Sequence, residues 1–146
     1  MTDRVFVDTN VFVYHFDVTQ QKKHEIASDW ISRLWESRQG RLSVQVLQEL
    51  YVTLTAKLDP GLDRPSAQNI VRSLFAWQPV PPDESILSMA WNIEDRWQFA
   101  FWDALMVATA KSAGCTLLLT EDLQHDQLVE GIRVVSPFKV EPGAVL

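Results

Sequence analysis

Cysteine is almost missing from this sequence, because Cys115 is the single one among 146 residues. One cysteine cannot form a disulfide within the chain or a cysteine-based zinc cluster, and we expect it to be a small buried apolar residue. The three histidines, His15, His24 and His125, lack the short spacings of histidine zinc motifs. Any metal bound by this chain would therefore need oxygen ligands.

Glycine and long apolar runs are also scarce. The chain has five glycines and contains neither G-x-G-x-x-G nor G-x-x-x-x-G-K-[ST], so a phosphate-binding loop has no support. No uncharged run approaches the roughly 18 apolar residues of a membrane span. The N-terminus leads straight into a predicted strand without the pattern of an export signal. We therefore expect a soluble, cytoplasmic protein.

Positive charge is in deficit. Thirteen Lys and Arg face nineteen Asp and Glu, which gives a net charge of -6. This is the wrong sign for a protein that holds long nucleic acid through its phosphates. It remains compatible with an enzyme whose acidic site is neutralised by divalent cations.

The length fits one domain over residues 1–146, with the composition of a globular protein. Short apolar runs alternate with amphipathic segments, which predicts a three-layer α/β/α sandwich around a central, mostly parallel sheet. The predicted strands cover residues 4–7, 41–44, 116–120 and 132–135. The predicted helices cover residues 21–38, 45–58, 66–77, 83–96 and 102–113.

Four acidic residues are expected at one edge of this sheet. Asp8 and Asp122 follow predicted strands, whereas Asp103 and Glu49 lie early in predicted helices. Strands of a parallel sheet end at the same edge, where ligands bind. Four carboxylates gathered there would repel one another unless a cation lay among them, and Mg²⁺ or Mn²⁺ prefers such oxygen ligands.

Each acid also has a simpler interpretation. Asp8 could cap a following helix, Asp122 could be a surface turn residue, and Glu49 lies opposite the apolar face of its predicted helix. Asp103 is the strongest candidate, because it is the one charged residue in the apolar stretch 99–110. A buried carboxylate without a partner would be costly there.

Four segments together resemble the PIN-domain ribonucleases, and most closely the VapC-type toxins of bacterial toxin–antitoxin pairs. They are FVDTNVFVY at 6–14, SVQVLQELY at 43–51, FWDALMVATA at 101–110 and LLTEDL at 118–123. The resemblance implies a Mg²⁺- or Mn²⁺-dependent endoribonuclease that forms a homodimer and is silenced by a cognate antitoxin. It also implies catalytic, metal-binding roles for Asp8, Glu49, Asp103 and Asp122, supported by Thr9, Asn10 and Thr120.

Two other functions remain as alternatives. One is an inactive PIN or receiver-like domain that only binds a partner, although four intact acids argue against it. The other is a phosphatase of the haloacid-dehalogenase type, whose motif has a second Asp where this chain has Asn10.

Metal-dependent hydrolysis of RNA would leave 5'-phosphate and 3'-hydroxyl ends, because water attacks phosphorus and the 3' oxygen departs.

Two details of the pattern give further expectations. Helical spacing predicts that Trp30, Trp35, Trp77 and Trp91 are core residues, and the aromatic cluster at 97–102 is expected in the core or a dimer contact rather than on RNA bases. Neighbours in an extended segment point to opposite sides, so only one of Glu121 and Asp122 can face the site. The family pattern of Ser or Thr two residues before the metal-site Asp favours Asp122.

Overall fold

The computed structural model describes residues 3–146 and contains, within them, one five-stranded sheet in the order β2-β1-β3-β5-β4. Strands β2, β1, β3 and β5 are parallel, and β4 joins β5 in the antiparallel sense. The mostly parallel sheet predicted from the sequence is confirmed. The strands are β1 Val5–Val7, β2 Gly40–Arg41, β3 Leu117–Leu119, β4 Leu128–Val129 and β5 Ile132–Val135.

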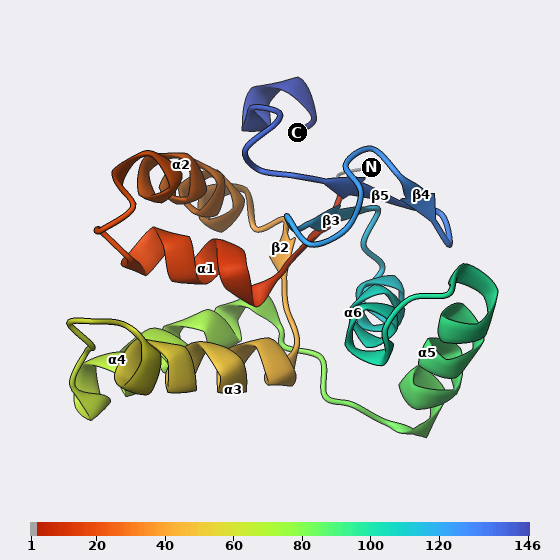
Figure 1. Ribbon diagram of the computed structural model, residues 1–146, viewed down its shortest axis with the longest axis horizontal. Helices are drawn as coiled ribbons and strands as arrows, with labels where there is room; N and C mark the ends of the chain where they lie inside the picture. The colour runs from red at the N-terminus through yellow and green to blue at the C-terminus, as the bar shows by residue number, and fades with distance from the viewer. Residues whose placement is uncertain (1–2) are drawn as a thin grey trace.

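Helices cover the two faces of the sheet, as expected for an α/β/α sandwich. Figure 1 shows α5 and α6 packed together on one side, whereas α1 and α2 pack together on the other. The helices are α1 Thr9–Phe16, α2 Gln21–Ser37, α3 Val44–Val52, α4 Arg64–Ser73, α5 Glu84–Trp97 and α6 Phe101–Ser112. A π-helical turn, Thr53–Lys57, extends α3, and 3-10 turns occupy Leu74–Trp77 and Pro142–Ala144.

The structure differs from the predicted elements in three places. The predicted strand 41–44 is wrong beyond Arg41, because the Ser43 hydroxyl accepts a hydrogen bond from the Val46 N–H and caps α3. Helix α1 is absent from the predicted elements, because its eight residues are mostly β-branched, aromatic or short polar ones with weak helix propensity. Strand β4 has two residues, too few for an alternating pattern.

The tryptophan prediction is half right. Trp30 and Trp77 are buried, but Trp35 is 44% exposed and Trp91 is 52% exposed. Both exposed rings lie on amphipathic helices, where helical spacing places a residue on a face without telling how far that face is covered. Cys115 is buried, as predicted.

Within residues 3–146, every helix is too short or too polar to cross a membrane.

Candidate functional site

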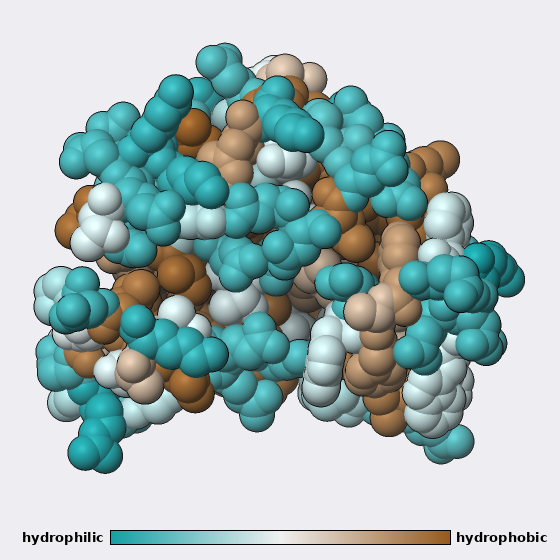
Figure 2. Space-filling view, viewed as in Figure 1, coloured by the Kyte–Doolittle hydropathy of each residue, from teal (hydrophilic) through white to brown (hydrophobic). Residues whose placement is uncertain are grey.

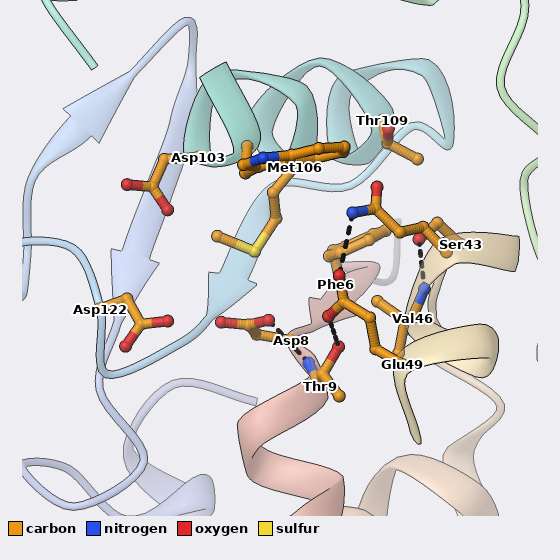
Figure 3. Close-up of a pocket in the computed structure, with 12 residues that line it drawn as sticks. Phe6, Asp8, Thr9, Ser43, Val46, Glu49, Asp103, Met106, Thr109 and Asp122 are labelled. Carbon is orange, nitrogen blue, oxygen red and sulfur yellow. Dashed lines mark hydrogen bonds between the residues drawn. The ribbon is translucent and has the colours of Figure 1, made fainter. Parts of the chain in front are cut away.

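A small pocket of about 140 Å³ lies at the carboxyl end of the parallel strands. Its walls come from β1, α1, α3, α6 and the loop after β3, as Figure 3 shows. All four predicted acids line it, so residues far apart in the chain meet at the expected edge of the sheet. The full lining is Phe6, Asp8, Thr9, Ser43, Gln45, Val46, Glu49, Trp102, Asp103, Met106, Thr109 and Asp122.

Asp8 is held in place by both halves of its carboxylate. One oxygen, Oδ1, accepts the Thr9 N–H at 2.7 Å, and the other, Oδ2, accepts the Thr120 hydroxyl at 2.8 Å. Asp8 is thus the N-cap of α1, which is the simpler interpretation, and it also faces the pocket. Its own N–H donates to Leu119 O at 3.1 Å, which ties the end of β1 to the end of β3.

Asp122 faces the pocket from the loop after β3. Its backbone N–H donates to the Thr120 hydroxyl at 3.1 Å, and Asn10 Nδ2 donates to its Oδ2 at 3.1 Å. In Figure 3 the side chains of Asp122 and Asp8 point toward each other. The three polar residues expected to support the site, Thr9, Asn10 and Thr120, therefore all bond directly to one of the four acids.

Glu121 lies outside the pocket lining. Its carboxylate accepts a short hydrogen bond from the Tyr14 hydroxyl and pairs with Lys23 Nζ at 3.4 Å. Lys23 Nζ also lies 4.7 Å from the centre of the Tyr14 ring. The neighbours Glu121 and Asp122 thus have separate partners, and of the two only Asp122 lines the pocket. Both lie in a bend after β3, whereas the sequence pattern predicts an extended segment.

Asp103 occupies the first turn of α6 and is partly buried. Burial raises the pKa of its carboxyl group above the ordinary value, and the negative charge of Asp122 raises it further. The first turn of a helix favours a carboxylate through the helix dipole. Helix α6 therefore directs Asp103 toward the pocket while it buries the apolar neighbours of Asp103.

Glu49 belongs to the exposed side of α3, as its position opposite the apolar face predicted. Its Oε2 nevertheless accepts the Thr9 hydroxyl at 2.9 Å, and its Oε1 accepts Gln45 Nε2 at 2.9 Å. These two bonds bring an exposed residue to the rim of the pocket. In Figure 3 it lies on the far side of Asp8 from Asp103 and Asp122.

The pocket is strongly acidic. None of the described residues that line it is Lys or Arg. Burial and the nearby charge of Asp122 raise the pKa of Asp8 to about 7, although the Thr120 and Thr9 hydrogen bonds act in the opposite direction. A carboxyl group so destabilised in its charged form gains from a neighbouring cation.

The carboxylate oxygens of the pocket suit a hard divalent cation, but they do not form one preassembled set of ligands around a single point. Carboxylate oxygens are the preferred ligands of Mg²⁺ and Mn²⁺. Among residues 3–146, no three His, Cys, Asp or Glu side chains lie close enough together to form a ready-made ligand group. The charge of Asp122 acts on both Asp8 and Asp103, and these three residues would hold a cation most directly.

Gln45 and Trp102 are two of the lining residues that were not predicted as site residues. Gln45 orients Glu49, and its position four residues earlier on the same helix is the sequence signal for such a pair. Trp102 is 64% exposed and lines the pocket beside Asp103, whereas Trp97 is partly buried and its indole N–H donates to Glu130 at 3.3 Å. Within the aromatic cluster at 97–102, Trp97 thus packs against the fold, whereas Trp102 belongs to the pocket.

Comparison with known proteins identifies the fold and the family. Residues 5–130 match the family described as PIN domain. No curated protein matches the sequence.

Solved structures share the fold at low identity. A FitAB complex bound to an IR36 DNA fragment is 21% identical with a TM-score of 0.70, covering 94% of this chain and 97% of that one. A toxin–antitoxin complex from Klebsiella pneumoniae is 17% identical with a TM-score of 0.66, covering 93% and 99%. VapC20 of Mycobacterium tuberculosis, a sarcin-ricin loop cleaving toxin, is 22% identical with a TM-score of 0.59, covering 78% and 86%.

Proposed function

Since this chain belongs to the PIN domain family, we propose that it is an endoribonuclease that hydrolyses RNA phosphodiester bonds with Mg²⁺ or Mn²⁺. The observation that carries the proposal is the acidic pocket, where Asp8, Asp103, Asp122 and Glu49 meet without a lining Lys or Arg. A purely structural cluster of this kind would only destabilise the fold through charge repulsion. A bound cation would offset this repulsion and would give the four carboxylates a role in catalysis.

The four acids would hold the metal, and their hydrogen-bond partners would set its ligands in position. Thr120 orients Asp8 and the backbone of Asp122, Asn10 orients the Asp122 side chain, and Thr9 orients Glu49. When bound, Mg²⁺ or Mn²⁺ supplies positive charge for the phosphodiester and lowers the pKa of an attacking water. The chain itself needs no Ser, Cys or His nucleophile.

Trp102 supplies an apolar surface at the mouth of the pocket. An exposed indole beside a phosphodiester site is suited to stack on an unpaired base, which would place the adjoining phosphate near Asp103. Attack of water on phosphorus with departure of the 3' oxygen would leave 5'-phosphate and 3'-hydroxyl ends.

The biological role that we propose is that of a toxin paired with an antitoxin. Structures of similar fold include a toxin–antitoxin complex, and VapC20 is a toxin that cleaves the sarcin-ricin loop. By this analogy the chain would act as a homodimer, and the antitoxin would silence it. An acidic pocket is complementary to a basic antitoxin segment.

Cleavage of RNA by purified protein tests the proposal. The chain is expected to cut structured RNA with Mg²⁺ or Mn²⁺ and to stop when EDTA is added, and the fragment ends identify the chemistry. Asp8→Asn and Asp103→Asn should abolish cleavage while the circular dichroism spectrum stays that of the wild type. Cleavage that continues in EDTA, or at the wild-type rate in either variant, would contradict the proposed function.

A further inference from the structure

Three arginines gather at the opposite, amino-terminal end of the sheet. Arg4, Arg38 and Arg41 line one hollow, and Arg38 and Arg41 continue into a second that also contains Trp35. We call the joined surface, made by Arg4, Trp35, Arg38 and Arg41, the arginine groove. It concentrates positive charge in a chain whose net charge is -6.

The guanidinium groups of the arginine groove are anchored but not neutralised. Arg4 Nη1 donates to Ala113 O at 3.1 Å, and Arg41 Nη1 donates to the carbonyls of Arg38 and Gly40 at 3.0 and 2.8 Å. Within residues 3–146, none of the three arginines is paired with a carboxylate. The other guanidinium N–H groups are therefore available to an anion.

Asp3 is the acidic residue that lines the same surface. Its Oδ1 accepts the Thr116 hydroxyl at 2.8 Å, so this carboxylate has a partner other than the arginines. Three positive charges therefore face one negative charge in the groove.

Trp35 adds a rigid aromatic surface next to Arg38. Its ring, 44% exposed, contacts buried Trp77 at a centroid distance of 5.9 Å. Trp77 in turn packs directly on Gly40, where an added Cβ would lie 2.4 Å from the Trp77 ring. The exposed indole is thus supported from below by the fold, as a stacking platform needs to be.

We propose that the arginine groove binds single-stranded RNA outside the cleavage pocket, with phosphates on the arginines and a base stacked on Trp35. The combination of guanidinium groups with an exposed indole favours RNA over an acidic peptide, which has no base to stack. The inference rests on the proposed function for the identity of the ligand. It deepens that function by giving an acidic nuclease a place to hold RNA.

The groove and the carboxylate pocket lie at opposite ends of the same strands. Arg4 and Asp8 flank β1 and are separated by about 13 Å at the rise of an extended strand. Along the neighbouring chain segment, Arg41 ends β2 and Ser43, two residues later, lines the carboxylate pocket. A strand of several nucleotides can therefore reach both places, whereas a dinucleotide cannot, because its one internucleotide phosphate occupies the cleavage pocket.

Binding of a labelled single-stranded RNA of about 15 nucleotides tests this inference. Fluorescence anisotropy is measured in the Asp8→Asn background, so that cleavage plays no part. Arg38 has a φ of 60°, which glycine adopts without strain, so Arg38→Gly removes the guanidinium group without disturbing the fold. Arg72→Gln is the matched control, because Arg72 is an exposed arginine on α4, outside the groove.

We expect Arg38→Gly to weaken binding about threefold to tenfold and to reduce the slope of log affinity against log salt by about 0.7, the value for one phosphate contact with a single strand. Trp35→Leu should weaken binding about tenfold with the slope unchanged. Arg72→Gln should bind like the parent protein. In the active protein, Arg38→Gly should raise KM for the long RNA and leave cleavage of a dinucleotide unchanged.

Two results would overturn the inference. The first is equal RNA binding by Arg38→Gly, Trp35→Leu and Arg72→Gln. The second is an Arg38-dependent but Trp35-independent site at which polyglutamate competes as well as RNA, since this would indicate an acidic protein segment as the occupant. Failure of the wild-type protein to cleave any RNA would contradict the proposed function instead, and the binding measurements would still decide the role of the arginine groove.

Discussion

Thr120 donates its hydroxyl hydrogen bond to Oδ2 of Asp8 at 2.8 Å, across 112 residues of sequence. The same hydroxyl oxygen accepts the N–H of Asp122 at 3.1 Å. One buried side chain therefore sets the positions of two acids on neighbouring strand ends, β1 and β3. Figure 2 shows polar and apolar side chains interspersed over the face of the molecule that is in view.

Replacing Thr120 by Val should impair the site without unfolding the protein. Valine keeps the shape but removes both hydrogen bonds, and changes of this kind next to metal ligands cost roughly 10- to 100-fold in activity or metal affinity. The loss is measured as the rate of RNA cleavage against Mg²⁺ concentration.

The control for this change is Thr55→Val, which removes a hydroxyl bonded to the Tyr51 carbonyl in the π-helical turn after α3, outside both the carboxylate pocket and the arginine groove. It should cleave RNA like the wild type. Equal rates for Thr120→Val and Thr55→Val would contradict the positioning role of Thr120.

Stability of the metal-free protein should fall as the pH rises from 5 to 8. The pKa of Asp8 is about 7 in the folded protein, above the roughly 3.9 of an unfolded chain. The folded state therefore keeps a proton that the unfolded state releases, and this contribution to the free energy of unfolding is lost as the pH passes through the folded pKa. Burial lowers the pKa of His15, which acts in the opposite direction in this range.

Asp8→Asn isolates the contribution of Asp8, because His15 contributes equally to both proteins. In EDTA the variant should melt at a higher temperature than the wild type at pH 8, and the difference should shrink toward pH 5. Thermal unfolding followed by circular dichroism measures both. A difference that grows toward low pH would show that the sign assigned to Asp8 is wrong.

Glu121 and Asp122 should respond differently to loss of charge. Glu121→Gln removes an ion pair with Lys23 outside the pocket and should leave Mg²⁺-dependent cleavage within a few-fold of the wild type. Asp122→Asn should raise the Mg²⁺ concentration for half-maximal rate by about tenfold or more. If Asp122 holds the metal through a water, its loss should impair cleavage less than Asp8→Asn does. The reverse order of the two effects would refute the assignment of Asp122.

Trp102 should contribute to RNA binding at the pocket. Trp102→Ala removes an exposed indole beside Asp103 and should raise KM for RNA about fivefold to tenfold, with kcat little changed. Trp91→Ala is the matched control, since its ring is 52% exposed on α5 and does not line the pocket. An equal effect of both substitutions would indicate a general loss of stability rather than stacking.

Most of the strands and helices, though not α1 or β4, and the edge at which the acids meet could be predicted from the sequence alone. Apolar runs such as 117–119 record burial on both faces of a strand, and parallel strands end at one edge for reasons of connectivity. Asp8, Asp103 and Asp122 could therefore be placed together before any coordinates. Topology also placed Glu49 at this edge, but its helical periodicity alone favoured a solvated surface residue, and the family resemblance decided for a role in the site.

What the tertiary structure decided is which partners each side chain meets. Thr9 and Gln45 turn the exposed Glu49 toward the pocket, and Tyr14 with Lys23 draws Glu121 away from it. The exposure of Trp35 and the joining of Arg4 with Arg41 depend in the same way on packing between distant segments. Periodicity is a property of one segment at a time, whereas a hydrogen bond or a groove depends on the distance between two, and that distance exists only after the chain has folded.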